Sequence, residues 1–600
     1  MTSREIRRKF LDFFEKRRHK VVASSSLIPA DSSVLFTTAG MQRFSPYLAG
    51  EKDIIKDFGT RHLASSQKCF RANDIEEIGD DTHHTFFEML GNWSIGEDSE
   101  DGYFKEGAIK YALDLLLEEY GIEKERLWIT IFKGNKDIPK DKESKEIWRR
   151  HGIPEERIRE FGEEDNLWGP VAKTGPCGPN TEIHYDRGEE YGCSSSNCGP
   201  NCSNCQRFVE IWNLVFMEYF KDENSNFKVL PFRNVDTGAG LERLASVLQE
   251  KNSAFETDLF NSLIQELIEI SSLDYEREKR KIRIIVDHVR GAVFLASEGI
   301  LPSNTDRGYI LRRILRRVMA FGKILKIEKG FQIKLAEKVI DLYKDIYPIL
   351  SSKQSEIITV IQKEEEKFDK TLEKGFKEFE VNLRDSIESG KKINSKRVFE
   401  LHSTYGFPLE ITKEICEEKG VKLDEKECDR LVEKHKEVSR AGVEKKFGGV
   451  GKNASYESTK LHTATHLLHA SLRRVLGDHV RQEGSDINSE RLRFDFSHPK
   501  KMTKEEIEEV ENLVNKKIKE DLKVKKEEMD FKEAVESGAL AFFKDKYPDR
   551  VSVYSIGDFS KEVCAGPHVE ETSELGKFKI KKEKSSSAGI RRIKAILENN

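Results

Sequence analysis

The sequence has no apolar run that approaches the roughly twenty residues needed to span a membrane. Charged residues interrupt positions 1–20 throughout, which excludes a secretory signal peptide. An excess of positive charge is also missing: the formal net charge is −5, so any nucleic-acid-binding surface must be local. There is no internal repeat and no low-complexity tail. We therefore expect a cytoplasmic protein without a membrane partner.

What is present is a charged, globular composition, with 37% hydrophobic and 35% charged residues. A chain of 600 residues is too long for one ordinary core, and length alone suggests roughly three to five domains. In a reducing compartment, the nine cysteines are expected to be thiols or metal ligands rather than disulfides.

The pattern along the chain predicts an α+β protein with three domains. Residues 1–245 mix helices with β-rich runs such as Val34–Phe36 and Leu127–Phe132. Residues 246–445 read almost wholly as helix, and residues 455–600 open with a helix and close with short strands. A Gly-rich break at Phe447–Lys452 is a plausible linker between the last two domains.

Two arginines far apart in the sequence suggest a phosphate clamp. Arg71 follows Phe70, and Arg243 follows a stretch with glycines at 238 and 240. Guanidinium groups make bidentate, charge-assisted contacts with phosphate oxygens, and glycines let the backbone approach a ligand closely. Taken singly, an Arg is usually a surface residue and a Gly-x-Gly is usually a turn.

Longer strings carry a resemblance to a known family. The segments around Arg71 and Arg243 resemble motifs 2 and 3 of class II aminoacyl-tRNA synthetases. The strings His83–Asn92, Thr174–Pro179 and Ile211–Phe216 are similar to the alanyl-tRNA synthetases in particular. This resemblance covers essentially the whole chain. It implies an antiparallel sheet with flanking helices, a helical tRNA-recognition domain and an α+β editing domain with zinc.

The resemblance also implies an activity, which is the ligation of alanine to tRNA(Ala) with ATP and Mg²⁺. Its catalytic residues would be Arg71, Asp236 and Arg243. Arg71 would meet the α-phosphate, Arg243 the adenine or the γ-phosphate, and Asp236 the α-ammonium group of alanine. Further ATP contacts would be His83, Gly240 and an aromatic ring at Phe86 or Phe87. The alanine pocket would comprise Met89, Trp168, Asn213, Val215, Asp236 and Gly238.

A pocket that fits alanine cannot reject glycine or serine well, because one methyl group is worth only ~1–3 kcal/mol. Hydrolytic editing of mischarged tRNA is the expected remedy, and residues 455–600 resemble the editing domain of this family. In that resemblance Gln482 lies near the editing pocket.

The third region also contains a candidate zinc site. His462 and His466 are four residues apart on one face of a predicted helix, and Cys564 and His568 follow about a hundred residues later. Three imidazoles and one thiolate suit tetrahedral zinc, which would either orient the tRNA 3′ end or activate water. An isolated HxxxH pair is more often structural, and His469 is then an equally good candidate.

A second cluster, Cys193, Cys198, Cys202 and Cys205, lies in an insert rich in Gly, Ser, Asn and Pro. Four thiolates within such a short loop could close a structural zinc knuckle. The alternative is a flexible loop with unligated thiols, since the spacing is not a double CxxC pattern and many relatives lack the insert.

The helical region holds a basic stripe formed by Arg312, Arg313, Arg316 and Arg317. Such a stripe on an apolar-backed helix suits an RNA backbone, although most charged faces are merely solvated. The segment resembles the acceptor-stem recognition domain of the family, in which Asn304 would read the wobble pair of tRNA(Ala). Ser403 stands where many relatives carry Asp.

Other functions remain as alternatives to the alanine–tRNA ligase. One is a stand-alone tRNA editing hydrolase with a non-functional synthetase half, and another is an RNA-binding paralogue. A third is a ligase that loads a different carrier. The retained Arg71, Asp236 and Arg243 argue against the first two. The sequence ends soon after Arg592, without the usual C-terminal module of the family, so we expect a monomer.

Overall fold

The computed structural model describes the chain except for residues 32, 97–101, 194, 196–197, 391, 435–454, 542–549, 588–589 and 599–600. It consists of two compact units, Met1–Asp424 and Glu425–Asn600. The expected linker Phe447–Lys452 lies outside the described residues. The domain boundaries expected at residues 245 and 455 stay predictions. None of the described helices combines the length and the apolar character that crossing a membrane requires.

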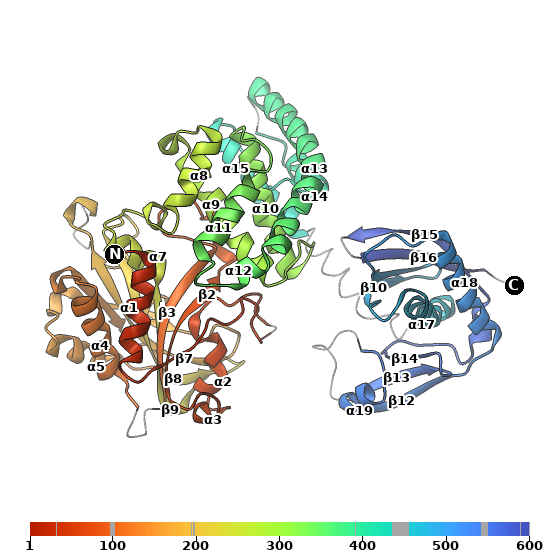
Figure 1. Ribbon diagram of the computed structural model, residues 1–600, viewed down its shortest axis with the longest axis horizontal. Coiled ribbons are helices and arrows are strands. Elements are labelled where there is room, and N and C mark those ends of the chain that lie inside the picture. Colours follow the sequence, from red (N-terminus) through yellow and green to blue (C-terminus); the bar gives the residue numbers. More distant parts are fainter. Residues whose placement is uncertain are drawn as a thin grey trace. The chain divides into compact units, whose positions relative to one another are not determined.

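A nine-stranded sheet forms the centre of the first unit (Figure 1). All strand pairs from β2 to β4 are antiparallel. The two pairs at the edges of the sheet, β1–β2 and β4–β5, are parallel. In spatial order the strands are β1 (Lys20–Val21), β2 (His62–Phe70), β3 (Phe86–Ile95), β9 (Phe227–Gly240), β8 (Phe208–Lys221), β7 (Gly175–Asp186), β4 (Leu127–Phe132) and β5 (Ile158–Phe161), with β6 (Leu167–Trp168) paired to β7. The antiparallel class II sheet expected from the sequence is confirmed.

Helix α1 (Ser3–Glu15) shows how the local sequence determines an element. Thr2 and Glu5 form a reciprocal capping box that satisfies free N–H groups at the helix start. Ile6, Phe10 and Phe14 follow at helical spacing and are fully buried. Helices of this unit before the helical region are α2 (Ser45–Leu48), α3 (Ile54–Phe58), α4 (Lys105–Asp114), α5 (Lys142–Arg150), α6 (Glu163–Asn166) and α7 (Leu241–Leu248).

The helical region lies within the same unit and packs against the sheet (Figure 1). Helix α9 contacts β3, and α10 packs along α9. The helices are α8 (Asn261–Ser271), α9 (Tyr275–Ser297), α10 (Asp306–Ile324), α11 (Phe331–Tyr343), α12 (Ile349–Ser352), α13 (Gln354–Ser389), α14 (Ser395–Tyr405) and α15 (Leu409–Glu418). The apolar triad Val34–Phe36, read as β-rich in the sequence, forms no strand, because only Phe36 is buried and Leu35 faces solvent.

In the second unit, helix α17 (Tyr456–Leu476) lies between two sheets (Figure 1). One sheet has the order β10 (Gln482–Ile487), β11 (Leu492–Ser497), β16 (Ile590–Glu598) and β15 (Lys577–Ser587). The other comprises β12 (Val524–Asp530), β13 (Arg550–Ile556) and β14 (Ser560–Val563). Helices α18 (Lys504–Lys519) and α19 (Phe531–Glu536) complete the unit. The hydrophobic core of this unit lies between α17 and β11, where Phe494 and Phe496 of β11 are fully buried.

Candidate active site and metal-binding clusters

One face of the central sheet collects the predicted substrate residues. Along β9, Asp236, Gly238 and Gly240 alternate and therefore point to the same side. The register places Met89 opposite Gly240 and Trp93 opposite Asp236 on β3. On β8 it places Asn213 opposite Gly238 and Val215 opposite Asp236. Residues that lie far apart in the sequence are thus brought to one patch of the sheet.

A cavity of about 120 Å³ opens on this face. Seven of its lining residues were predicted from the sequence: Arg71, His83, Phe87, Met89, Gly238, Gly240 and Arg243. Four were not: Thr82, His84, Glu210 and Glu242. Of the two aromatic candidates, Phe87 lines the cavity, whereas Phe86 stacks on Phe294 in the core with ring centroids 3.8 Å apart.

Two arginines stand at the cavity with different partners. The exposed guanidinium of Arg71 lies 4.9 Å from the ring centre of Phe87. Arg243 donates to Glu210 Oε2 over 2.6 Å. Desolvation alone would raise the pKa of Glu210, but Arg243 outweighs it and holds this pKa below its ordinary value. The cavity therefore combines two cations suited to phosphate with one ionised carboxylate.

Asp236 lies deeper, with only 4% of its surface exposed. The indole Nε1–H of Trp93 donates to its Oδ1 over 2.6 Å. Burial raises the pKa of Asp236 to about 8, although the hydrogen bond from Trp93 opposes the shift. Gly91 makes this contact possible, because a Cβ at that position would lie 2.6 Å from the Trp93 ring. A buried carboxylate with one donor is suited to receive a cationic group.

Apolar side chains lie on the strands that flank Asp236. Met89, Trp168 and Val215 pack in one hydrophobic cluster. A Cβ on Gly238 would lie 3.0 Å from the Met89 sulfur, so glycine leaves the room that a larger residue would fill. Asn213 is held by its neighbours, since its Oδ1 accepts from Asn180 over 2.9 Å. The residues predicted for the alanine pocket thus come from β3, β6, β8 and β9, and of these Met89 and Gly238 line the cavity.

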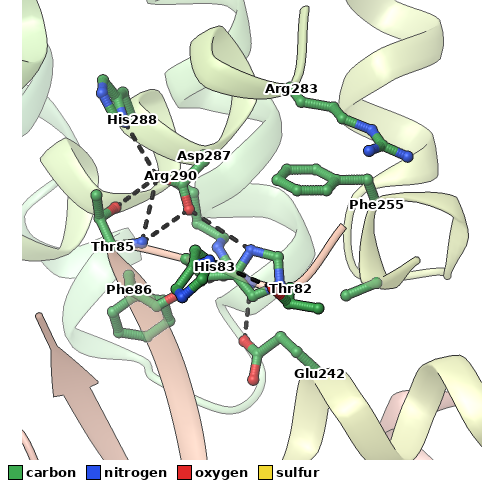
Figure 2. A network of polar contacts seen from close by, with 12 residues as sticks. Thr82, His83, Thr85, Phe86, Glu242, Phe255, Arg283, Asp287, His288 and Arg290 are labelled. Carbon is green, nitrogen blue, oxygen red and sulfur yellow. Dashed lines mark hydrogen bonds and ion pairs between the residues drawn. The ribbon is translucent and has the colours of Figure 1, made fainter. Parts of the chain in front are cut away.

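A buried polar network fixes the segment that enters β3 (Figure 2). Asp287 on α9 accepts from the Thr85 backbone N–H over 3.1 Å and from its hydroxyl over 2.7 Å. His288 Nδ1 lies 3.0 Å from Asp287 Oδ2, the same oxygen that accepts from the Thr85 hydroxyl, and His288 Nε2 lies 3.0 Å from Arg317 on α10. Arg290 completes the set by donating to Glu242 over 3.0 Å. Helix α9 thus anchors the wall of the cavity.

The predicted basic stripe on α10 is not a solvent-facing surface, and that expectation is wrong. Only 8% of Arg312 and 1% of Arg317 are exposed. Arg312 and Arg316 both contact Glu364 of α13, through Nε atoms 3.2 Å and 2.9 Å from its Oε1. The reason is that α13 packs against α10 and covers the charges.

Arg312 also reaches the loop before α10, where it donates to Asn304 Oδ1 and to the Pro302 carbonyl oxygen. Asn304 itself is exposed. Arg313 is half-buried and pairs with Glu76 over 2.8 Å. RNA contacts by Asn304, Arg312, Arg313 and Arg316 stay predictions.

In the second unit the four predicted ligands meet. One ring nitrogen from each of His462, His466 and His568 and the Sγ atom of Cys564 all lie within 4.8 Å of one another. Cys564 Sγ is 3.5 Å from His462 Nε2, close to the ~3.3–3.8 Å between ligands around tetrahedral zinc. Hydrogen bonds from the imidazoles outweigh burial and lower the pKa of the Cys564 thiol to about 2, which favours a thiolate.

Each imidazole of this cluster has its Nδ1 atom occupied. His462 Nδ1 lies 3.1 Å from the Pro567 carbonyl oxygen, and His466 Nδ1 lies 3.2 Å from Glu562. His568 Nδ1 lies 3.3 Å from the Thr463 hydroxyl, and its buried Nε2 has no hydrogen-bond partner among the described residues. Holding Nδ1 directs Nε2 towards a metal, so the donor set fits zinc.

The alternative ligand His469 is placed differently. Its Nδ1 lies 2.9 Å from Glu562 Oε1, and it does not belong to the metal-binding group. Gln482, expected near the editing pocket, begins β10 and donates to Ser485 over 3.2 Å. Its role stays a prediction. In the first unit, the Sγ atoms of Cys193, Cys198, Cys202 and Cys205 form another group within 4.8 Å.

The missed cavity residues had weak sequence signals. Glu210 directly precedes the string Ile211–Phe216 and is one of two carboxylates, with Glu218, in a mostly apolar strand. Glu242 lies between Gly240 and Arg243, in a segment already singled out. Neither signal distinguishes a cavity residue from a solvated edge, because strand pairing decides which side each carboxylate faces.

Comparison with known proteins adds an independent finding. The family described as tRNA synthetases class II (A) matches residues 5–474. The threonyl and alanyl tRNA synthetase second additional domain matches residues 551–594. An alanine–tRNA ligase of Borrelia hermsii (strain HS1 / DAH) is 47% identical, covering 99% of each chain. The enzyme of that description from Treponema denticola is 48% identical over 100% of this chain and 99% of its own. That of Thermotoga maritima is 39% identical over 99% of this chain and 80% of its own.

Proposed function

Because the chain belongs to the alanine–tRNA ligases of class II, we propose that it activates alanine with ATP and transfers it to tRNA. It is a class II aminoacyl-tRNA ligase with an editing-related second additional domain. The observation that carries the site assignment is the single cavity in which Arg71, Arg243 and the neighbours of Asp236 meet. A stand-alone editing hydrolase does not explain the family match over residues 5–474.

In the first step, the alanine carboxylate attacks the α-phosphorus of ATP and pyrophosphate leaves. Asp236, once ionised, holds the α-ammonium group, and the methyl group faces Met89 and Val215. Arg71 neutralises the developing charge at the α-phosphate, while Phe87 beneath it offers a ring face to the adenine. The protein supplies position and charge, and no side chain needs to accept a proton.

Glu210 is the carboxylate placed to hold the Mg²⁺ that accompanies ATP. It lines the cavity, is kept ionised by Arg243, and lies in the stretch between the two arginine motifs. Oxygen ligands from one or two carboxylates together with phosphates are the usual surroundings of Mg²⁺. With ATP bound, Arg243 would pair with phosphate or adenine in place of Glu210, and the Glu210 carboxylate would then be available to hold Mg²⁺.

In the second step, the terminal hydroxyl of tRNA attacks the adenylate carbonyl carbon and AMP leaves. We propose that Asn304 reads the acceptor stem and that Arg312 positions it, since Arg312 donates to the Asn304 side-chain oxygen. Arg313 and Arg316 of α10 are partly exposed and paired with Glu76 and Glu364, and they would contribute positive charge to the RNA backbone by exchanging these carboxylates for phosphate.

In the second unit we propose hydrolytic editing of Ser- and Gly-mischarged tRNA, with Gln482 near the scissile ester. Zinc would be held by His462, His466, Cys564 and His568. Four protein ligands leave no open coordination position, so the metal would order the site rather than activate water. Thr463 and Glu562 fix the orientation of the ligand imidazoles.

The test is aminoacylation of a tRNA(Ala) transcript, together with deacylation of Ser-tRNA(Ala). The intact chain is expected to charge alanine and to hydrolyse the seryl ester. A Cys564→Ser/His568→Ala variant should charge alanine normally but release serine slowly. Absence of charging by well-folded protein would contradict the ligase assignment, and unchanged seryl hydrolysis in the variant would contradict the editing assignment. Sedimentation velocity tests the predicted monomer, and fractionation tests the predicted cytoplasmic location.

A further inference from the structure

The segment that joins β7 to β8 gathers four thiols without a hydrophobic core of its own. Cys193 and Cys202 place their sulfur atoms 3.6 Å apart, and those of Cys198 and Cys205 are 3.5 Å apart. All four Sγ atoms lie within 4.8 Å of one another and are half-buried. The described residues between the cysteines are Gly, Pro, Ser and Asn, and Pro200 is their only apolar side chain, too little to bring four sulfurs together.

Local backbone turns bring the thiols into this arrangement. The Cys198 N–H donates to the Ser195 carbonyl oxygen over 3.1 Å, and the Cys202 N–H donates to the Gly199 carbonyl oxygen over 3.2 Å. Each turn therefore ends on a cysteine. The two close pairs alternate along the chain, since the first cysteine is near the third and the second is near the fourth.

We propose that Cys193, Cys198, Cys202 and Cys205 bind a structural Zn²⁺ ion that closes the connection between β7 and β8. A Zn–S bond of about 2.3 Å implies sulfur atoms about 3.8 Å apart around a tetrahedron, and the observed separations are close to this value. A disulfide needs about 2.05 Å and can join only two of the four sulfurs. An all-thiolate set selects zinc over hard cations such as Mg²⁺ or Ca²⁺.

The four cysteines lie between the end of β7 and the start of β8, the strand that carries Glu210 of the cavity. Arg207 makes a bidentate ion pair with Asp186, over 2.6 Å and 2.7 Å, which ties the start of β8 to the end of β7. Glu210, which contacts Arg243 in the cavity, is only two residues into β8. On the other side, Asn201 donates to Asp165 over 3.0 Å, just before Trp168.

Because of this connection, the metal should also affect ATP binding, an inference that rests on the proposed function. By fixing the first residues of β8, the zinc positions Glu210 and Arg243 for ATP. Loss of the metal should therefore raise the KM for ATP about tenfold, because a small misplacement of binding groups is costly, while the KM for alanine changes less. The metal itself takes no part in the chemistry.

The test is zinc content per chain, measured by plasma mass spectrometry on full-length protein purified under reducing conditions. The Cys198→Ser/Cys202→Ser variant should contain about one equivalent less than the wild type. Ser203→Ala, an exposed neighbour in the same segment, is the matched control and should lose none. A His466→Ala/Cys564→Ser variant removes the other cluster, so a difference between the two double variants assigns each metal separately.

Cys198→His is the variant that separates ligation from folding, because histidine can replace one thiolate in a zinc site. It should retain the metal and the low KM for ATP, whereas Cys198→Ser should lose both. Cobalt substitution of the His466→Ala/Cys564→Ser protein should give intense sulfur-to-metal absorption. Equal zinc content in wild type and Cys198→Ser/Cys202→Ser would overturn the proposal, as would iron in place of zinc. If the zinc is found but the KM for ATP is unchanged, the positioning role fails while the metal site stands.

Discussion

Trp93 and Asp236 face each other across β3 and β9, and the indole N–H donates to the carboxylate over 2.6 Å. Trp93 belongs to the same hydrophobic cluster as Val215, and Met89 packs against this cluster. One hydrogen bond compensates little of the cost of burying a carboxylate, so the group is held ready for a cation. The recognition of the α-ammonium group of alanine depends on this arrangement.

The Asp236→Asn variant tests that role. Asparagine keeps the size of the side chain and can still accept from Trp93, but it carries no charge. Alanine activation should fall about 10²–10³-fold, which corresponds to ~3–4 kcal/mol, because the α-ammonium group loses its buried ionic partner. The variant should fold about as stably as the wild type at neutral pH, because the buried carboxyl group of Asp236 is mostly protonated there and asparagine is also uncharged. Isothermal calorimetry should show that ATP binding is retained, and wild-type alanine affinity in this variant would contradict the assignment.

Alanine binding should depend on pH through the same residue. The pKa of Asp236 is raised to about 8 in the free protein, so the carboxylate is mostly protonated at neutral pH. The ammonium group binds the ionised form, and alanine affinity should therefore rise with pH, by up to about tenfold per unit, until about pH 8. Binding at pH 7 should release close to one proton, measurable by calorimetry in buffers of different ionisation enthalpy. An affinity that does not change between pH 6 and 8 would exclude this account.

The free energy of unfolding should also depend on pH through Asp236. The pKa of Asp236 is higher in the folded protein than its ordinary value of 3.8, so the unfolded chain loses this proton first. The contribution of protonated Asp236 is present below about pH 4 and is lost as the pH rises towards 8. Asp236→Asn should remove this part of the pH dependence of thermal unfolding.

The contact between Thr85 and Asp287 should stabilise both the fold and the cavity. Thr85→Val removes a hydroxyl that donates over 2.7 Å to a fully buried carboxylate, at a cost of ~1–3 kcal/mol. His83 and His84 directly precede Thr85 and line the cavity, so the KM for ATP should rise as well. Thr85→Ser keeps the hydroxyl and should resemble the wild type in both thermal unfolding and kinetics. Equal behaviour of the valine and serine variants would show that the hydrogen bond contributes nothing.

Glu562 should control zinc affinity in the second unit without touching the metal. Its two oxygens lie 3.2 Å from His466 Nδ1 and 2.9 Å from His469 Nδ1. Glu562→Gln removes the charge and one acceptor, and zinc affinity should fall about 10–100-fold in competition with a chromophoric chelator. Glu527→Gln changes an exposed glutamate of β12 and is the control. If both variants hold zinc equally tightly, the carboxylate does not orient the ligand.

Local signals in the sequence are sufficient to predict some elements and some site residues. The capping box of Thr2 and Glu5 and the helical spacing of Ile6 and Phe10 are local signals of this kind, and they account for the start and the buried face of α1. Spacing also predicted that His462 and His466 share a helix face, because helix geometry is set within one turn. The resemblance to a family located Arg71 and Arg243, which the fold brings to one cavity.

Other features depend on contacts between distant segments. In the sequence, Arg312 and Arg316 look like an exposed stripe. Their partner Glu364 is about fifty residues away on α13, and no sequence pattern near the arginines shows that α13 packs against them. Glu210 was missed because only strand pairing turns it towards Arg243. Conversely, Val34–Phe36 has strand-forming residues, but no neighbouring strand pairs with it and only Phe36 finds a core.

The most direct test of the central claim is amino-acid-dependent ATP–pyrophosphate exchange with alanine, serine, glycine and threonine. The pocket between Asp236, Gly238 and Met89 predicts strong exchange with alanine, weaker exchange with serine and glycine, and none with threonine. Loss of the alanine signal in Asp236→Asn would tie the exchange to this pocket. No exchange with any of the four, from well-folded protein, would contradict the account.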